Sequence, residues 1–339
     1  MPSKTVLIVS NPQDEHTVRV SALIHELGAK PVLFFPEYLG IGRPLSIGQS
    51  MNKIKPDIML MTESEAIDLE EVYSIWYRRP RLVSFDQEAI SPEGVDFARD
   101  EWKAALEAVY ALLNEKLWVS HPDRLRDAAR KPIQLRIAQS LGFRTPRTLI
   151  TNDAGKAKAF FDLCDGKVIV KATGSGWVYA QDGEDVFFVL TNRPSQRDIE
   201  ASDEIALSPV TFQEEIPKAY EIRANIVGRK VLAIRIDSQN SAISELDWRR
   251  YDTSNTPYSP YNLPTNIENK CLRLAQALGL EFGAIDLIRQ PNGEYVFLEI
   301  NGNGQFLWAE ELSGIGISNA LASLLSGLTP PLKHANLSA

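Results

Sequence analysis

A predicted β-hairpin late in the sequence limits the possible folds more than any other segment. Two apolar runs rich in β-branched residues, 284–288 and 296–300, are separated by a Pro-Asn-Gly turn signal. The first run contains Asp286, and the second contains Glu299 and leads into Asn301. Because side chains alternate between the two faces of a strand, Glu299 and Asn301 share a face. With Asp286 on the neighbouring strand, we expect three oxygen-bearing side chains to converge.

Such a set of oxygen ligands suits Mg²⁺, which takes octahedral oxygen coordination and commonly shares it with phosphate and water. The same hairpin also fits an ordinary pair of strands whose polar side faces solvent. Geometry alone does not separate these two interpretations, so the rest of the chain has to decide between them.

Length and composition are those of a globular protein with about two or three lobes. The 339 residues are 44% hydrophobic and 24% charged, and the net charge of −8 argues against a general nucleic-acid-binding protein. No apolar run approaches the roughly 20 residues that cross a bilayer, and the N-terminus shows no signal-peptide cleavage site. The cysteines, Cys164 and Cys271, lie in helical patterns as core residues, and the histidines lack metal-ligand spacing. We therefore expect a cytoplasmic protein.

The N-terminal segment alternates strand and helix patterns. Strands are predicted at Thr5–Val9, Pro31–Phe35, Pro56–Met61 and Tyr73–Tyr77, and a helix at Glu15–Leu27. This order is typical of a small parallel sheet with βαβ connections. No Gly-x-Gly-x-x-Gly follows the first strand, which argues against a Rossmann dinucleotide site.

The pattern of predicted elements changes in the middle of the chain. Long helical patterns cover Ser91–Trp118 and Asp127–Leu141, and a new unit begins near residue 150. From there short strands follow in quick succession, which predicts an antiparallel sheet with helices on one side. Those strands are Val168–Lys171, Trp177–Ala180, Val186–Leu190, Val210–Glu214, Glu221–Val227 and Val231–Asp237, with helices at Asp153–Cys164 and Pro264–Leu278.

The predicted organisation therefore combines α/β and α+β parts. We expect an N-terminal parallel α/β domain at 1–120, a central α+β lobe at 121–210 and a C-terminal antiparallel α+β lobe with the metal site at 211–328. Residues 329–339 contain little apolar material and are expected to fray.

Two lysines are candidates for phosphate binding. Lys171 ends an apolar strand and precedes a turn containing Gly174, Ser175 and Gly176, so an ammonium group and bare backbone N–H groups can face a phosphate. This is not a Walker A loop, because Gly-Lys-Ser/Thr is missing. Lys131 opens a helix, where a cation is unusual unless it reaches toward an anion. Each lysine taken alone also fits an ordinary solvated surface residue.

The strand that ends in Gln213 and Glu214 continues into Glu215 and Ile216. A strand edge with free backbone groups can pair with an adenine ring, and a carboxylate a few residues on, Glu221, can accept ribose hydroxyls.

Two arginines on the following strands are catalytic candidates. Arg223 and Arg235 lie on adjacent predicted strands, and we expect both to face one pocket and to hold phosphate or developing negative charge. Salt bridges to Glu221 or Asp237 are the alternative.

Together these residues resemble the ATP-grasp superfamily over nearly the whole chain. The ordered set is an early lysine, a strand lysine with a glycine turn, a Gln-Glu hinge and then Asp followed by Glu-x-Asn. The resemblance implies an ATP-grasp fold and assigns the ATP contacts to Lys131, Lys171, Ser175, Gly176, Gln213, Glu214, Glu215, Ile216 and Glu221. It assigns Mg²⁺ to Asp286, Glu299 and Asn301.

Within that superfamily the chain is similar to the graspetide synthetases, the microviridin-type macrocyclases. The similar segments are Trp76–Pro80, Pro132–Thr151, Glu221–Gly228, Ile236–Gln239 and Asp247–Arg249. Ligases of the ribosomal-protein S6 and glutathione types share the grasp residues but not Asp247-Trp248-Arg249. One departure is Ala129 before Arg130-Lys131, where relatives often carry Asn.

This likeness implies an ATP-dependent ligase that cyclises a ribosomally made precursor peptide by ester or amide bonds. Arg223 and Arg235 would act on the acyl phosphate, and Asp247, Trp248, Arg249 and Arg78 would serve leader and substrate binding. A homodimer is implied by the family only. The alternatives are an ATP-grasp ligase that joins a free amino acid to a peptide or protein tail, and a catalytically inactive nucleotide-binding or peptide-binding module.

Overall fold

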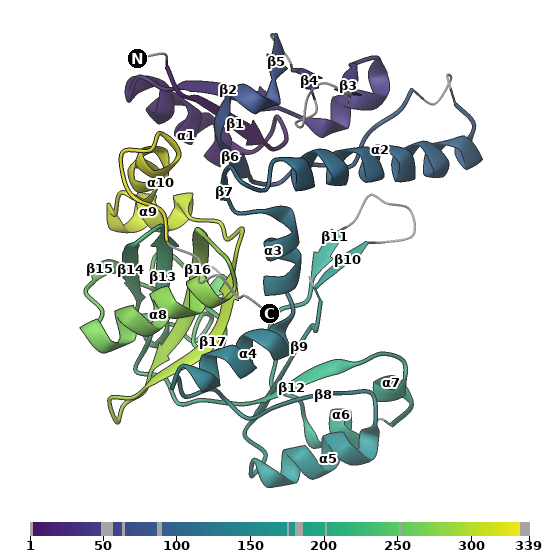
Figure 1. Ribbon diagram of the computed structural model, residues 1–339. Helices are drawn as coiled ribbons and strands as arrows, with labels where there is room; N and C mark the ends of the chain where they lie inside the picture. Colours follow the sequence, from purple (N-terminus) through teal and green to yellow (C-terminus); the bar gives the residue numbers. More distant parts are fainter. Residues whose placement is uncertain are drawn as a thin grey trace.

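The computed structural model has three lobes (Figure 1). A central cleft lies between the central and C-terminal lobes, whose residues line its pocket. It describes residues 3–48, 57–62, 65–86, 90–174, 176–179, 186–200, 202–250 and 252–332. The N-terminal lobe lies at the top of Figure 1, the C-terminal lobe below it, and the central lobe at the bottom.

A four-stranded parallel sheet forms the N-terminal lobe, as predicted. Its order is β2-β1-β6-β7, with β1 at Thr5–Val9, β2 at Lys30–Phe34, β6 at Val72–Tyr77 and β7 at Leu117–Val119. The Asp14 side chain accepts the His16 N–H and so caps α1 (Glu15–Glu26). Val20 and Ile24 of this helix are fully buried against β1, which joins the helix to the sheet.

The predicted strand at Pro56–Met61 does not join the parallel sheet. It forms β4 (Asp57–Met61), between β3 (Leu45–Gly48) and β5 (Ala66–Asp68) in a separate antiparallel sheet. The physical reason is its alternation: Ile58 and Leu60 are buried while Met59 and Met61 are exposed. Strands inside a parallel sheet are buried on both faces, so this one-sided pattern belongs to an antiparallel sheet. Two short 3₁₀ helices, η1 (Pro36–Ile41) and η2 (Leu69–Glu71), complete the lobe.

Two predicted helices are shorter than expected. The pattern at Ser91–Trp118 gives α2 (Pro92–Leu112), capped by Ser91, and its last apolar residues form β7 beside β6. The pattern at Asp127–Leu141 gives two helices, α3 (Pro122–Ala128) and α4 (Lys131–Ser140). Pro132 explains the break, because proline fits the first turn of a helix but not its interior.

The central lobe is a three-stranded antiparallel sheet in the order β8-β12-β9. The strands are β8 (Thr148–Thr151), β9 (Val168–Lys171) and β12 (Val210–Glu214), and the helices are α5 (Ala154–Leu163), α6 (Gln196–Glu200) and α7 (Ser202–Ala206). A hairpin of β10 (Trp177–Tyr179) and β11 (Val186–Phe188) extends from the central lobe in the direction of α2 (Figure 1). Strand β12 is the middle strand of this sheet, so residues 210–214 pair with the strands of the central lobe.

The C-terminal lobe is a five-stranded antiparallel sheet in the order β15-β14-β13-β16-β17. Its elements are β13 (Tyr220–Val227), β14 (Lys230–Ile236), β15 (Tyr258–Tyr261), β16 (Phe282–Arg289), β17 (Tyr295–Asn301), α8 (Thr265–Ala277), η3 (Ser238–Asn240) and η4 (Trp248–Arg250). Helices α3, α4 and α8 share a buried core with this sheet, including Ala128, Ala138 and Cys271. Residues 121–141, predicted for the central lobe, therefore pack on the C-terminal one.

The last helices connect the two ends of the chain. Helices α9 (Leu307–Ser313) and α10 (Ile317–Leu325) share one buried core with α1, β1 and β6, and the Ser74 hydroxyl donates to the Leu325 carbonyl. Of the tail that was expected to fray, Leu332 is buried and its N–H donates to Glu281 at 2.7 Å. Residues 333–339 lie outside the described residues.

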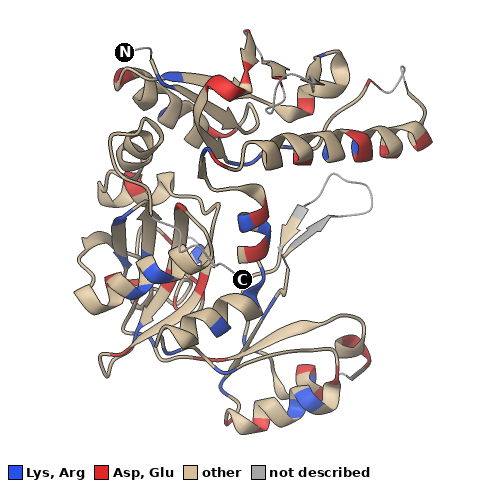
Figure 2. Cartoon of the chain, viewed as in Figure 1, with Lys and Arg blue, Asp and Glu red and all other residues tan. Residues whose placement is uncertain are grey.

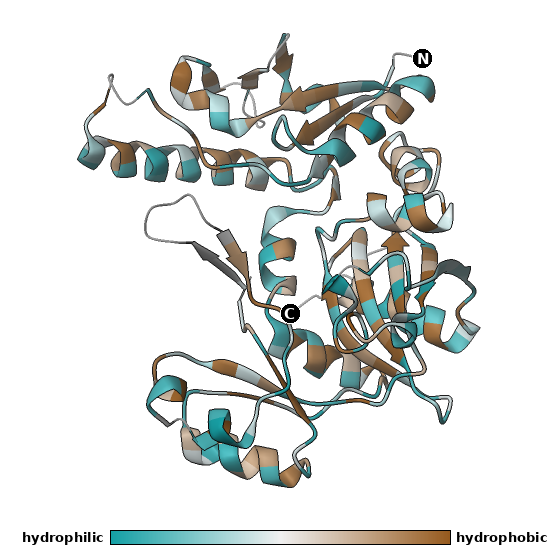
Figure 3. Ribbon diagram, turned by 180° about the vertical axis from the view of Figure 1, so that it is seen from behind, coloured by the Kyte–Doolittle hydropathy of each residue, from teal (hydrophilic) through white to brown (hydrophobic). Residues whose placement is uncertain are grey.

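Hydropathy and charge follow this architecture. The strands of the large sheets are mainly hydrophobic (Figure 3), and acidic and basic residues mix along α2 and α3 (Figure 2). Both cysteines are buried and free, as predicted. Across the described ranges, no helix combines the length and the apolar character that a membrane span requires.

Candidate functional site

Two carboxylates face each other on the strand pair that the sequence predicted. Asp286 of β16 lies opposite Glu299 of β17 in the antiparallel register, so both side chains point to one face of the sheet. The pairing shifts between Asp286 and Leu287, where two residues of β17 oppose one of β16. Such a bulge re-aims side chains, and Leu298 lines the same pocket as Glu299.

Each carboxylate has a cation beside it. Arg223 of β13, paired with Asp286 in the next ladder, donates from Nη1 to both carboxylate oxygens at 2.8 Å. Lys131, at the start of α4, places Nζ 3.4 Å from Glu299 Oε2 and 3.5 Å from the Ala172 carbonyl. Helix α4 packs on β17, which explains why a lysine at its N-terminus reaches this strand. The helix end that seemed unsuited to a cation therefore faces an anion.

The two carboxylates have opposite pKa shifts. Burial would raise the pKa of Glu299, but the charges of Lys131 and Lys171 lower it to about 2. Burial raises the pKa of Asp286, Arg223 opposes that shift, and the neighbouring Glu299 charge adds to it. Burial and the nearby Lys131 charge lower the pKa of Lys171. This cluster of mutually perturbed groups is typical of a functional site.

One pocket in the central cleft collects most of the predicted site. Lys131, Lys171, Asp286 and Glu299 all line it. It is also lined by residues of the predicted nucleotide contacts and of the glycine turn, namely Gln213, Glu214, Glu215, Ile216, Glu221 and Gly176. Ser175 lies outside the described residues. The convergence on which the sequence interpretation depended is therefore present.

The predicted hinge is held by polar contacts of its own. Lys171 Nζ donates to Gln213 Oε1 at 2.9 Å, and Gln213 Nε2 donates to Thr148 Oγ1 at 2.9 Å. The backbone N–H groups of Glu214 and Glu215 donate to the carbonyls of Arg147 and Lys167. Their side chains form ion pairs with Arg147 and Arg193, so the two N–H groups and the two carboxylates are already engaged.

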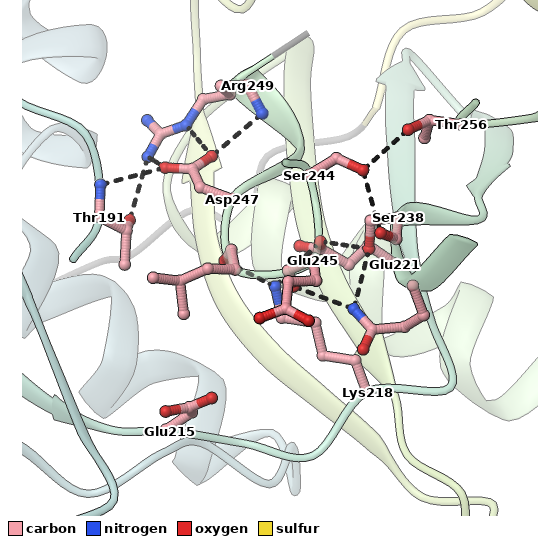
Figure 4. A network of polar contacts seen from close by, with 12 residues as sticks. Thr191, Glu215, Lys218, Glu221, Ser238, Ser244, Glu245, Asp247, Arg249 and Thr256 are labelled. Carbon is pink, nitrogen blue, oxygen red and sulfur yellow. Dashed lines mark hydrogen bonds and ion pairs between the residues drawn. The ribbon is translucent and has the colours of Figure 1, made fainter. Parts of the chain in front are cut away.

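Glu221 is almost completely buried in a polar network at the other end of the pocket (Figure 4). Its Oε1 accepts from Lys218 Nζ at 3.0 Å and from Ser238 Oγ at 2.9 Å. Burial raises the pKa of Glu221, and the Lys218 charge opposes that shift. Lys218 also lines the pocket, although no sequence motif singled it out.

The segment Asp247–Arg249 lines the same pocket. Asp247 accepts the Thr191 N–H at 3.2 Å and pairs with Arg249 at 2.7 Å (Figure 4). Burial would raise the pKa of Asp247, but hydrogen bonds from Arg249 lower it to about 2. The Trp248 ring packs on Trp308 with centroids 4.6 Å apart. This segment therefore links the central lobe at Thr191 to the C-terminal lobe.

Arg235 is a correction to the predicted site. In the β13–β14 ladder Arg223 pairs with Ile234, and Ile222 pairs with Arg235. The two arginines therefore point to opposite faces of the sheet. Arg235 stacks over the Tyr220 ring at 4.0 Å and binds Asp237 with its Nε at 2.8 Å, away from the carboxylates.

Arg78 is the second correction. Its side chain is 1% exposed and lies 3.2 Å from Asp14 in the N-terminal lobe. A side chain buried to this degree is not available on a peptide-binding surface. Its Nη1 instead donates to the carbonyls of Asn303 and Gly304.

Asn301 is at the exposed end of β17 and turns toward its own loop. Its side-chain oxygen accepts the Asn303 N–H at 3.0 Å, and it is not one of the residues lining the pocket. Within the described ranges, no group of three His, Cys, Asp or Glu side chains is placed to hold a metal. The adjacent oxygens of Asp286 and Glu299 nevertheless form the kind of donor pair that a hard divalent cation prefers.

The apolar wall of the pocket was not predicted. It includes Ile169, Ile288 and Leu298 beside the predicted Ile216. Ile288 follows Asp286 by two residues, so strict strand alternation could have identified it. Leu298 could not have been identified in this way, because it reaches the pocket only through the bulge.

Comparisons with known proteins agree with this geometry. Residues 5–126 match the MvdD pre-ATP grasp domain, and residues 127–325 match the RimK-like ATP-grasp domain. A tetrahydromethanopterin:alpha-L-glutamate ligase from Methanocaldococcus jannaschii is 24% identical over 211 residues, 60% of this chain and 68% of that protein.

Two solved structures are similar over almost their full length. The macrocyclase MdnC from Microcystis aeruginosa MRC, bound with precursor peptide MdnA, is 28% identical, with a TM-score of 0.83 over 96% of this chain and 100% of that one. The RiPP-associated ATP-grasp ligase of Chryseobacterium gregarium, in complex with ADP and a leader and core peptide, is 29% identical, with a TM-score of 0.86 over 98% and 99%. With its MvdD-type N-terminal domain and more than half of its length matched by the RimK-like model, the chain belongs to the RimK-like ATP-grasp family and is an ATP-grasp ligase.

Proposed function

We propose that this ligase is a leader-dependent peptide macrocyclase of the microviridin type, which uses ATP to join side chains of one ribosomal precursor peptide. The observation that carries the proposal is the convergence of Lys131, Lys171, Asp286 and Glu299 on one pocket. It occurs in a chain that is similar from end to end to a macrocyclase with its precursor peptide and to a ligase with ADP and a peptide.

The reaction has two steps. A carboxylate oxygen of a peptide Asp or Glu attacks the γ-phosphorus of ATP, the bond to the β–γ bridging oxygen breaks, and ADP leaves. A Thr or Ser hydroxyl, or a Lys amine, then attacks the acyl carbon, the bond to the phosphate oxygen breaks, and inorganic phosphate leaves while the proton passes to a base or to water. The peptide loses one water for each ring. Catalysis of this kind depends on positioning and charge stabilisation.

The residues have separate tasks in this proposal. Lys131 and Lys171 hold the phosphates, and Glu221 accepts from the ribose at the far end of the pocket. The apolar wall described above packs against the adenine. The Arg223 guanidinium pairs with the Asp286 carboxylate. In the reaction it binds the acyl phosphate or stabilises the tetrahedral oxyanion.

Mg²⁺ is the metal that fits the two carboxylates. Asp286 and Glu299 would hold it, and Asn301 Oδ1, which accepts the Asn303 N–H, has a second lone pair with which it would join them. In this structure Arg223 and Lys131 neutralise the two carboxylates. A bound Mg²⁺ would neutralise negative charge on the transferring phosphoryl group.

Peptide binding is proposed for the side of the pocket formed by Asp247, Trp248 and Arg249. Their contacts to Thr191 and Trp308 connect two lobes, so a leader docked on the central lobe would influence the nucleotide pocket through them. We further propose a cytoplasmic enzyme that acts as a homodimer.

The test is a mass measurement. The protein is incubated with ATP, Mg²⁺ and a candidate precursor, a short peptide with repeated Thr and Glu or Asp from a reading frame next to its gene, and a parallel reaction contains the core without its leader. We expect ADP release stimulated by the full precursor and the loss of one water mass per ring, with little conversion of the leaderless core. ADP release that does not respond to the precursor, with an unchanged peptide mass, would contradict the proposal.

The alternative is a ligase that adds a free amino acid to a peptide or protein tail, which the similarity to a glutamate ligase favours. The same measurement separates the two activities. Amino-acid addition raises the substrate mass by one residue, whereas cyclisation lowers it by one water.

A further inference from the structure

The loop after β17 lies directly beneath the catalytic candidates. Gly304 packs so closely that a Cβ there would be 2.7 Å from Arg223 Nη2 and 2.6 Å from the Ala284 Cβ. Its N–H donates to the Asn301 carbonyl. The conformation of this loop therefore sets where the Arg223 guanidinium, and with it the Asp286 carboxylate, can lie.

The N-terminal lobe holds this loop from the other side. Arg78 Nη1 donates to the Asn303 carbonyl at 2.7 Å and to the Gly304 carbonyl at 3.1 Å. Arg79 adds a bond from Nη2 to the Asn303 carbonyl at 3.1 Å. Arg78 comes from the end of β6, more than 200 positions earlier in the sequence, and so joins two lobes at the border of the active site.

A second contact fixes the end of the loop. His16 Nδ1 lies 3.0 Å from Asp14 Oδ1, and its Nε2 accepts the N–H groups of Phe306 at 3.2 Å and Leu307 at 3.4 Å. Acceptance at Nε2 requires a neutral ring with its proton on Nδ1. Burial lowers the pKa of His16 against the opposing effect of the Asp14 hydrogen bond, in agreement with a neutral ring.

Asp14 unites the two contacts. Its Oδ1 accepts a hydrogen bond from His16 Nδ1, and its Oδ2 lies 3.2 Å from Arg78 Nε. The exposed fractions of the Arg78 and Asp14 side chains are 1% and 5%. An arginine so deeply buried is expensive unless it is paired, and here it is both paired and aimed at two main-chain carbonyls of another lobe.

We propose that Asp14, His16 and Arg78 are positioning residues for the ligase reaction. They lock residues 303–307 so that the loop holds the Arg223–Asp286 pair in its reactive arrangement. None of the three touches the nucleotide pocket, and each acts through the loop. The inference rests on the proposed function for its catalytic readout only, because the loop contact can be measured without turnover.

The main test substitutes Arg78→Lys, which keeps a positive charge but has a single side-chain nitrogen and so cannot contact Asp14 and both loop carbonyls at once. We expect kcat to fall at least about tenfold, because small displacements of reacting groups are costly, while the KM for ATP and the melting temperature stay close to wild type. Amide hydrogen exchange at residues 303–307 should become faster. The matched control is Arg81→Lys, an exposed arginine of the same segment that lies 3.8 Å from Glu37 and has no bond to the loop.

A second variant changes the loop itself, on the side that contacts the C-terminal lobe. Gly304→Ala leaves the N-terminal lobe intact and should lower kcat in the same way, and it keeps the inference testable if Arg78→Lys fails to fold. Because both variants act on one loop, their effects in the double variant should be less than additive.

Three results would overturn the inference. They are an unchanged kcat in both single variants, a loss explained by a lower melting temperature, and loop exchange no faster than in the Arg81→Lys control. If the wild-type protein itself shows no peptide-dependent turnover, the proposed function fails, while the exchange measurement still decides the positioning role.

Discussion

Two buried arginine–aspartate pairs lie on either side of the loop at residues 303–307, and their environments differ. In the N-terminal lobe, His16 and Arg78 lower the pKa of Asp14 although burial would raise it. In the C-terminal lobe, the pKa of Asp286 is raised by burial and by Glu299, despite Arg223. The Asp14 carboxylate has a contact from His16 beside its ion pair with Arg78, whereas the Asp286 carboxylate lies beside a second carboxylate, Glu299.

This difference separates a structural pair from a functional one. A buried ion pair is favourable only when its remaining hydrogen-bonding groups are also satisfied. His16 meets that condition for Asp14, while Arg78 Nη2 has no hydrogen-bond partner within the described residues. Asp286 lies directly opposite a second carboxylate, Glu299, and adjacent carboxylate oxygens are the ligands that a hard divalent cation prefers. The comparison therefore supports a metal role for the second pair and a positioning role for the first.

The largest expected effect comes from removing the charge that distinguishes the two pairs. Glu299→Gln should reduce ADP release at least about 10²-fold, as loss of an electrostatic stabiliser does, without changing the fold. The matched control is Glu294→Gln in the same hairpin, which removes an exposed ion pair with Arg144. Equal activity of the two variants in an ADP-release assay would contradict a functional role for the Glu299 charge.

The second prediction compares stability. Asp14→Ala leaves Arg78 buried and uncompensated, so it should lower the free energy of unfolding by about 3–5 kcal/mol. Asp286→Ala should lower it by less, because the Glu299 charge still interacts with Arg223. Urea denaturation of both variants tests this order, and a larger loss for Asp286→Ala would reverse the comparison.

The third prediction concerns acid. The pKa of Glu299 falls from 4.5 to about 2 on folding, so its charge stabilises the folded protein above pH 4.5 and that contribution is lost as the pH falls toward about 2. Wild-type protein should lose stability across this window, and Glu299→Gln should lose less. Urea midpoints at about pH 5 and about pH 3 measure the difference, and parallel losses would refute the assignment.

The smallest effect is expected for a third arginine–aspartate pair, Arg235 with Asp237. Their side chains are 40% and 20% exposed, and the pair lies on the opposite face of the sheet. Arg235→Met should leave kcat unchanged and alter the free energy of unfolding by no more than about 0.5 kcal/mol. A clear loss of kcat would restore the original prediction that Arg235 is catalytic.

Local sequence was sufficient for most strands and for the central hairpin. Thr5–Val9, Val168–Lys171 and Val210–Glu214 have the predicted bounds, because apolar periodicity and flanking turn residues act over a few positions. The ordered lysines, the hinge and the carboxylates also identified the cleft, since alternation along β16 and β17 fixes which side chains share a face.

Tertiary structure decided what depends on register and on contacts between lobes. The two-residue turn Gly228-Arg229, with Gly228 at φ +55°, sets the β13–β14 register, and one further residue would have turned Arg235 toward the pocket. The bulge beside Asp286 brought Leu298 into the pocket. The family likeness assigned Arg78 to leader and substrate binding, but its side chain is buried and donates to a loop from the other end of the chain. Such long-range contacts arise from packing between distant segments, which local periodicity does not encode.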